Sequence, residues 1–301
     1  MAAQLPDADA DGHRVVILDG AVGTELGKRG LDTRSPLFSS VALLSDEGRR
    51  ILRDLHLEYL RAGADIVTAA TFRTNRRALE AAGQGSRFPD LVGAAVAEAL
   101  AARDEHGSGL VAGSMAPVED CYRPDKRPAP EALFTEHLEH ARALALAGCD
   151  LLLVETIASG EEGISAIEAA SATGLPICAS AQIAPDGKLL DGSDAREFFT
   201  AAAAAGAGAV LINCIPPDGI DTMLEVASSA GVPFGAYAHL GEMDAAVRWP
   251  RSPVLEPEAY ADRAARWIER GATMIGGCCG TTPLHIAAVA RRFGRAGRPG
   301  T

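Results

Sequence analysis

The chain has 301 residues, of which 48% are hydrophobic and 23% charged, a composition typical of a globular protein with a large buried core. Its 28 Lys and Arg against 40 Asp and Glu give a net charge of −12 with no basic block, which argues against a nucleic-acid partner because phosphate binding needs clustered cations. No apolar run reaches the ~18 residues of a membrane span and the acidic start lacks the order of a secretory signal, so we expect a cytoplasmic protein without a membrane partner.

Short apolar, β-branched segments recur along the chain, with helical spacing of apolar residues between them. The segments are "VVIL" at 15, "DIVTAA" at 65, "LVAGS" at 110, "DLLLVET" at 150, "PICASAQI" at 176, "AVLINC" at 209, "PFGAYAH" at 233 and "TMIGGCC" at 273. Continuous apolar strands indicate a sheet covered on both faces, and strand–helix alternation indicates parallel pairing. These units predict an α/β fold, a single-domain (β/α)8 TIM barrel over residues 15–293, better than an open doubly wound sheet. We expect a disordered tail at 1–14 and a flexible tail at 294–301.

Two acidic residues stand at the ends of predicted strands. Asp19 lies just past the first strand and Glu155 just past the fourth. The catalytic rim of a (β/α)8 barrel is built from these strand ends, so we expect both carboxylates there. A carboxylate in this place can also cap the next helix or orient a neighbouring group, and the spacing alone does not separate these roles.

The segment after the third predicted strand lacks any periodicity. Residues 114–130, "SMAPVEDCYRPDKRPAP", are rich in Pro and charge, and in a barrel they belong to the catalytic face. They are a candidate lid or substrate loop, with a solvated insertion as the alternative. In the helix that follows, His137 and His140 lie three residues apart, and we expect them on an exposed helix face rather than at a metal.

The last predicted strand ends in two adjacent cysteines, Cys278 and Cys279. Successive side chains of a strand point to opposite faces, so the strand must break there if both thiols are to reach one ligand. Three nearby glycines (Gly276, Gly277, Gly280) supply the backbone freedom for such a turn. A disulfide between the pair is not expected, because neighbouring Cα atoms lie ~3.8 Å apart, below the ~4.4 Å of ordinary disulfides.

A third cysteine, Cys214, ends the sixth predicted strand, whose carboxyl end meets that of the eighth on the barrel rim. Three soft ligands with one open position are typical of catalytic zinc. Cysteines are also common core residues, which is the role we expect for Cys149 and Cys178. The pair of adjacent thiols with the third at a converging strand end favours Zn²⁺.

Four motifs carry a resemblance to a known family. "LDGAVGTEL" at 18, "LLVETI" at 152, "INC" at 212 and "GGCC" at 276 resemble the homocysteine S-methyltransferase family, in family order and over residues 15–293. The resemblance implies a (β/α)8 zinc enzyme that methylates homocysteine to methionine. It implies that Cys214, Cys278 and Cys279 bind the metal and are catalytic, with the substrate thiol in the fourth position.

The resemblance also implies how homocysteine is held. Asp19 of "LDG" and Glu155 of "VET" would bind its amino-acid end, and Glu155 would belong to the catalytic residues. The backbone N–H groups of the turn from Gly20 to Thr24 would suit its carboxylate. "TAATFRTN" resembles the family's second-strand segment, which makes Thr71 and Asn75 further substrate-binding candidates.

The stretch "YAHLGE" at 237–242 departs from the family, whose members commonly have a Pro-Asn sequence there with the asparagine near the zinc. This chain has Ala238 and His239 instead. Imidazole is a good zinc ligand, so we hypothesise that His239 occupies or neighbours the open position when substrate is absent. The alternatives are that His239 lies beside the zinc ligands without binding the metal, or that it is exposed to solvent. The departure leaves a thiol other than homocysteine open as the acceptor.

The methyl donor must carry an activated methyl group. The chain has no room for corrinoid and folate modules, which argues against a full cobalamin-dependent methionine synthase. Aromatic side chains suit a cationic donor, and the candidates for lining its site are Phe72, Tyr122, Tyr237 and Trp249. The resemblance favours S-methylmethionine or S-adenosylmethionine, with betaine as the alternative. A redox protein that uses the adjacent dithiol and an inactive zinc protein that binds thiols are rival interpretations, and the oligomeric state stays open.

Overall fold

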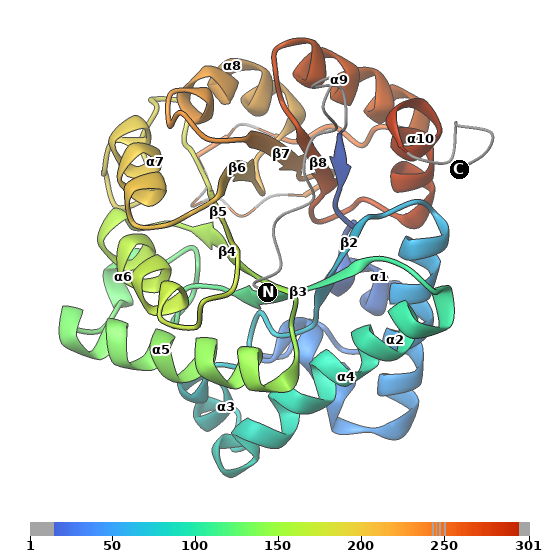
Figure 1. Ribbon diagram of the computed structural model, residues 1–301, viewed down its shortest axis with the longest axis vertical. Helices are drawn as coiled ribbons and strands as arrows, with labels where there is room; N and C mark the ends of the chain where they lie inside the picture. Colours follow the sequence, from blue (N-terminus) through green and yellow to red (C-terminus); the bar gives the residue numbers. More distant parts are fainter. Residues whose placement is uncertain (1–14, 243, 245, 247, 250, 295–301) are drawn as a thin grey trace.

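Eight parallel strands form a barrel at the centre of the molecule, with helices around it (Figure 1). The computed structural model describes residues 15–294 except 243, 245, 247 and 250. The strands are β1 (Val16–Ile17), β2 (Ile66–Ala69), β3 (Leu110–Met115), β4 (Leu151–Ile157), β5 (Ile177–Ala181), β6 (Ala209–Asn213), β7 (Phe234–Ala238) and β8 (Met274–Gly277). The predicted tail at 1–14 and, apart from Gly294, the predicted tail at 294–301 lie outside the described residues, and the proposed domain limits stay a prediction.

The strands follow one another around the barrel in the order β1-β8-β7-β6-β5-β4-β3-β2. The barrel closes between its first two strands through a single bridge of Leu18 to Ile66, with the Asp19 N–H donating to the Ile66 carbonyl at 2.9 Å. The (β/α)8 fold expected from the repeated units is therefore confirmed. The site-bearing carboxyl ends of β1, β4, β6 and β8 lie on one rim, as in every parallel barrel.

The outer layer consists of α-helices and short 3-10 segments (η). They are α1 (Val22–Lys28), η1 (Phe38–Leu44), α2 (Asp46–Arg61), α3 (Arg76–Ala81), η2 (Gly85–Arg87), α4 (Phe88–His106), η3 (Pro124–Lys126), α5 (Pro130–Ala147), α6 (Gly160–Ser171), α7 (Ala195–Ala204), α8 (Pro217–Ser228), α9 (Pro257–Glu269) and α10 (Pro283–Phe293). Their ends follow from sequence. The Ser45 hydroxyl accepts from the Gly48 N–H and begins α2, while Gly148 ends α5 in the left-handed conformation that the "LAGCD" turn predicts.

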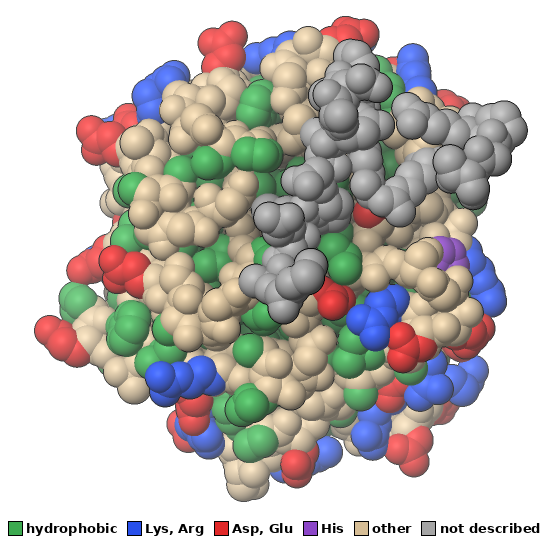
Figure 2. Space-filling view, viewed as in Figure 1, with side chains coloured by type: hydrophobic (Ala, Val, Ile, Leu, Met, Phe, Trp, Pro, Cys, Tyr) green, Lys and Arg blue, Asp and Glu red, His purple; other side chains and the backbone are tan. Residues whose placement is uncertain are grey.

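The core has two parts. A large cluster lies between the barrel and the helices, and a smaller one fills the barrel interior with side chains such as Val16, Leu153 and Leu211. Cys149 belongs to the outer cluster and Cys178 to the inner one, as predicted for core cysteines. On the face shown in Figure 2, acidic and basic side chains are mixed around the periphery. None of the described helices is long and apolar enough to span a membrane.

One expectation about the helices is wrong. His137 and His140 of α5 are each 1% exposed, because they fall on the same inner face as Leu133 and Leu144. The Nε2 atom of His137 lies 3.3 Å from Oε1 of Glu162, and that of His140 lies 3.0 Å from the Thr74 hydroxyl. Both imidazoles are thus held by polar partners inside the helical layer.

Candidate metal centre and substrate cavity

The three rim cysteines reach the same cavity because the chain turns sharply after β6 and after β8, although Cys278 lies outside the compact group that Cys214 and Cys279 form with His239. Cys214 follows β6 directly and has a left-handed backbone with φ of 54°, an uncommon conformation for a residue with a side chain. β8 ends at Gly277, so Cys278 and Cys279 lie beyond the strand, where the prediction requires the break. At Gly280, φ is 81° and a Cβ would lie 2.1 Å from the Leu240 carbonyl oxygen, so only glycine fits.

Backbone hydrogen bonds fix this turn against β7. The Cys278 N–H donates to the Ala238 carbonyl at 2.9 Å, and the Leu240 N–H donates to the Cys279 carbonyl at 2.8 Å. The Thr281 hydroxyl donates to the Cys278 carbonyl at 2.7 Å. The two neighbouring thiols are therefore presented on a rigid support.

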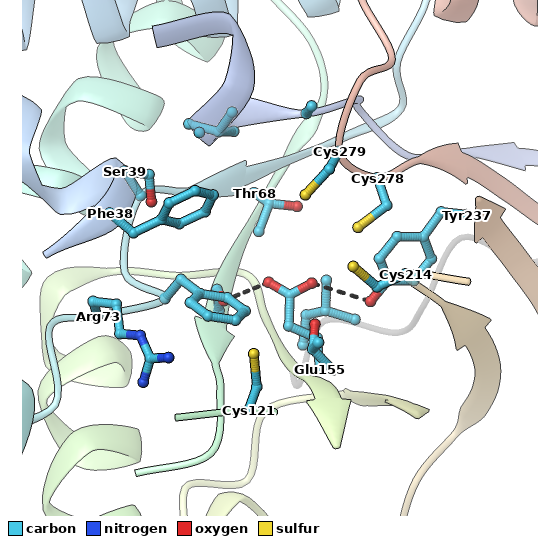
Figure 3. Close-up of a pocket in the computed structure, with 18 of the residues that line it drawn as sticks. Phe38, Ser39, Thr68, Arg73, Cys121, Glu155, Cys214, Tyr237, Cys278 and Cys279 are labelled. Carbon is cyan, nitrogen blue, oxygen red and sulfur yellow. Dashed lines mark hydrogen bonds between the residues drawn. The ribbon is translucent and has the colours of Figure 1, made fainter. Parts of the chain in front are cut away.

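The sulfur atoms of Cys214, Cys278 and Cys279 lie on the same side of the cavity (Figure 3), and each changes the pKa of the others. Hydrogen bonds from Cys214 and Cys278 lower the pKa of Cys279 well below its ordinary value, against the effect of burial. The same contacts raise the pKa of Cys214, which is buried. Three sulfur atoms, one of them with a strongly lowered pKa, form a soft donor set of the kind that holds zinc.

His239 lies beside this group. Ligand atoms of Cys214, His239 and Cys279 all lie within 4.8 Å of one another, and Nδ1 of His239 is 3.7 Å from the Cys214 sulfur. Its Nε2 lies 2.5 Å from the Glu242 carbonyl, which can only accept, so Nε2 carries a proton. Burial lowers the pKa of His239, but the hydrogen bond to Cys279, the charge of Cys279 and the Glu242 carbonyl together outweigh this and raise it. The ring thus directs Nδ1 at the sulfur atoms.

The two predicted carboxylates also reach the rim. Asp19 accepts hydrogen bonds from the Thr68 N–H at 2.7 Å and the Thr68 hydroxyl at 2.9 Å. Glu155 accepts from the Ser114 hydroxyl at 2.5 Å and the Tyr237 hydroxyl at 3.1 Å. Burial raises the pKa of Asp19 to about 8 and that of Glu155 to about 7. Two carboxylates held so tightly can stay buried because their oxygens are satisfied.

Glu155 does not follow β4, as the sequence suggested, but lies within it. The strand continues to Ile157 with an irregular register after Val154, and Thr156 has φ of 60°. This bulge turns the Glu155 side chain toward the cavity at the centre of the rim, where Figure 3 shows its carboxylate between the labelled aromatic rings and thiols.

A cavity of about 340 Å³ connects these groups. Asp19, Glu155 and the three rim cysteines line it, together with Gly20. Its aromatic walls are Phe38, Phe72, Tyr122 and Tyr237. The structure therefore brings nine of the residues that the sequence singled out to one space, large enough for small ligands but not for a macromolecule.

Four predicted residues do not line this cavity: Thr71, Asn75, His239 and Trp249. The Thr71 hydroxyl donates to the Ser114 carbonyl at 2.9 Å, and the Asn75 side chain accepts from the Ala78 N–H as the cap of α3. Trp249 donates to the Ile183 carbonyl at 2.7 Å and packs over Gly219. The hydrogen bonds of Thr71 and Asn75 fix the conformation of the segment after β2, which places Phe72 and Arg73 in the cavity wall.

Sequence reasoning missed several lining residues. Phe38 comes from η1, a segment with no periodic pattern. Arg73 lies in the "TAATFRTN" motif, whose other residues Thr71, Phe72 and Asn75 were predicted to belong to the site. The loop after β3 does contribute, since Asp120, Cys121 and Tyr122 line the cavity. The Pro-rich, charged sequence of residues 114–130 was the feature from which these three lining residues could have been predicted.

Comparisons with known proteins agree with this geometry. A family model described as homocysteine S-methyltransferase matches residues 16–293. A homocysteine S-methyltransferase of Escherichia coli (strain K12) is 32% identical, with 94% of this chain and 96% of the relative covered. A selenocysteine Se-methyltransferase of Brassica oleracea var. italica is 27% identical, with 92% and 88% covered. The metallated form of the homocysteine methyltransferase MmuM from Escherichia coli matches with a TM-score of 0.77 and 29% identity, over 94% of this chain and 97% of that one.

Proposed function

The chain belongs to the homocysteine S-methyltransferase family, and from this we propose that it transfers a methyl group from an activated donor to the thiol of homocysteine, forming methionine. The observation that carries the proposal is the junction of three thiols and two buried carboxylates in one cavity. The enzyme is thus a zinc-dependent S-methyltransferase whose barrel spans residues 15–293.

The donor set fits a zinc ion. Cys214, Cys278 and Cys279 offer soft sulfur ligands, and the pKa of Cys279 is lowered toward the thiolate that a metal binds. When bound, the metal keeps the acceptor thiol as a thiolate at neutral pH, where a free thiol of pKa ~8.5 is mostly protonated. The solved MmuM form described as metallated supports a metal in the family.

We infer that His239 completes this donor set when the cavity holds no substrate. Its Nδ1 lies among the sulfur atoms, and its Nε2 is fixed by the Glu242 carbonyl, the arrangement expected of an imidazole ligand. With a metal bound, the acceptor thiol would take the position that His239 holds in the substrate-free protein. Because His239 is 6% exposed, it has little solvent to move into and stays beside the bound thiol.

Asp19 and Glu155 receive the ammonium group of homocysteine. Their raised pKa values mean that the ionised form of both carboxylates is disfavoured in the empty cavity. An ammonium group that enters the cavity lowers these pKa values and so favours the ionised form. The Ser114 and Tyr237 hydroxyls hold the Glu155 carboxylate in one orientation. Gly20 and the backbone N–H groups that begin α1 face the substrate carboxylate. The thiol is thereby aimed at the donor from a fixed direction.

The transfer is a displacement in one step. The homocysteine sulfur forms a bond to the methyl carbon while the bond from that carbon to the donor heteroatom breaks, and the electron pair leaves with the donor. The aromatic walls of Phe38, Phe72 and Tyr122 suit the positive charge that the donor loses. S-methylmethionine is the donor we favour, ahead of S-adenosylmethionine and betaine. The Brassica relative named for selenocysteine makes a selenol the alternative acceptor.

Incubation of the zinc-loaded protein with ¹³C-labelled homocysteine and each donor tests this function. We expect labelled methionine by mass spectrometry with S-methylmethionine, and a loss of zinc and activity in Cys279→Ser. Cys149→Ser, which alters a buried cysteine outside the cavity, is the control and should keep both. Absence of labelled methionine with every donor would refute the proposal. Activity that survives without zinc but needs an oxidised dithiol would favour the redox interpretation.

A further inference from the structure

Arg73 lies in the segment between β2 and α3 and lines the cavity. It is the only cationic side chain among the lining residues that the structure describes, against three carboxylates, those of Asp19, Asp120 and Glu155. A partly buried guanidinium without a carboxylate partner is available to an anionic group of a ligand.

The neighbouring arginines are paired and Arg73 is not. Arg76 binds Glu139 at 2.5 Å, and Arg77 binds Glu136 at 2.6 Å and Glu119 at 3.4 Å. No carboxylate within the described part of the chain lies at ion-pair distance from Arg73. Its one hydrogen bond goes from Nη1 to the Glu119 carbonyl at 2.5 Å.

The guanidinium is held in place with most of its donors unused. Its carbon lies 5.4 Å from the centre of the Phe72 ring, and its charge acts on the Cys121 thiol in the cavity wall. Of the five N–H donors of an arginine, only the one to Glu119 has a partner among the described residues. The remaining planar donors match the two oxygens of a carboxylate.

Its place in the cavity separates it from the acceptor site. Figure 3 shows Arg73 across the view from Cys214 and Cys278, with Glu155 between them. Under the proposed function, homocysteine occupies the side with the thiols and carboxylates. A ligand that reaches Arg73 is therefore the second substrate.

On this geometry, and resting on the proposed function, we propose that Arg73 binds the carboxylate of the methyl donor. The enzyme then selects donors that carry both a cationic methyl-bearing centre and a carboxylate, and discriminates against simple sulfonium or ammonium cations. The aromatic rings contact the cation and Arg73 binds the other end of the molecule.

Binding calorimetry with two probes tests the proposal. S-methylmethionine is compared with (3-aminopropyl)dimethylsulfonium, which differs only by the absence of the carboxylate. We expect the zinc-loaded wild-type protein to bind S-methylmethionine about 10- to 100-fold more tightly, as the loss of hydrogen bonds to a charged group implies. Arg73→Gln should abolish this preference by weakening the first probe alone, and Arg73→Lys should retain part of it.

Arg77→Gln is the matched control, because Arg77 also contacts Glu119 but does not line the cavity. It should keep the wild-type preference. An unchanged preference in Arg73→Gln, equal weakening of both probes, a selective loss of homocysteine binding, or no preference in the wild type would each overturn the proposal. If the preference holds while labelled homocysteine is never methylated, the proposed function fails and the carboxylate site stands.

Discussion

At the scale of single residues, the site depends on side chains whose ordinary behaviour is altered by burial. Asp19 and Glu155 retain protons to unusually high pH, while contacts among the thiols lower the pKa of Cys279. Each shift has a use in the proposed reaction, since the carboxylates bind the ammonium group of the substrate and the acidified thiol binds a metal ion. His239 belongs with the thiols, because its ring is fixed by the Glu242 carbonyl and directed at sulfur.

The role of His239 gives a prediction at this scale. In His239→Ala, X-ray absorption of the substrate-free zinc protein should show one light-atom ligand of the imidazole type replaced by water oxygen, with the three sulfur ligands retained. Zinc affinity should fall about 10-fold, because three thiolates still hold the ion. The control is His285→Ala. His285 lies on α10, and its imidazole is hydrogen-bonded to the Leu255 carbonyl. An identical coordination sphere in His239→Ala and wild type would exclude the ligand role.

At the scale of elements, buried polar contacts attach the loop after β3 to the helical layer. Oε1 of Glu162 on α6 accepts from the Val118 N–H at 2.8 Å and also lies 3.3 Å from Nε2 of His137 on α5. Glu162 is 2% exposed, so none of these groups has water to replace a lost partner. The same loop carries Cys121 and Tyr122 into the cavity wall, which makes Glu162 a support of the site from outside it.

Glu162→Ala should therefore lower the free energy of unfolding by roughly 2–4 kcal/mol, since it leaves a buried N–H and a buried imidazole unpaired. The matched control is Glu161→Ala, one residue earlier on the same helix. Glu161 pairs with Arg127 at the surface, where such ion pairs contribute ~0–1 kcal/mol. Urea unfolding of the two variants measures the difference. Equal losses of stability would mean that the buried contacts of Glu162 are not what holds the loop.

The same elements show how far the sequence could be interpreted. The periodic pattern identified every barrel strand, and the break after Gly277 followed from the geometry of adjacent side chains. It missed the inner placement of His137 and His140, although these residues fall at helical spacing from Leu133 and Leu144, because polar residues were assigned to the exposed face. Phe38 and Arg73 could not be placed, since segments without regular structure take their positions from tertiary packing.

At the scale of the whole molecule, the cavity is a cost to stability as well as a site. In the substrate-free protein, burial disfavours the ionised forms of Asp19 and Glu155, which an unfolded chain ionises freely. Functional cavities often hold such unfavourable groups, and the closed barrel with its two core clusters compensates for them. The consequence appears in the pH dependence of unfolding.

Glu155 has an ordinary pKa of 4.5 and a folded pKa of about 7, so between these values the folded chain keeps a proton that the unfolded chain has released. Raising the pH through this window therefore favours unfolding, and the stabilising effect is fully present only below the unfolded value. Asp19, raised from 3.8 to about 8, adds a slope of the same sign. Glu155→Gln should remove up to about 3 kcal/mol of the change in unfolding free energy between pH 4.5 and 7, because an amide does not titrate there. The variant should still fold, since the Ser114 and Tyr237 hydroxyls can turn to suit the amide. Urea unfolding of substrate-free protein across this pH range measures the change, and Glu161→Gln should run parallel to wild type. A Glu155→Gln profile as steep as that of the wild type would show that Glu155 is already ionised in the empty cavity.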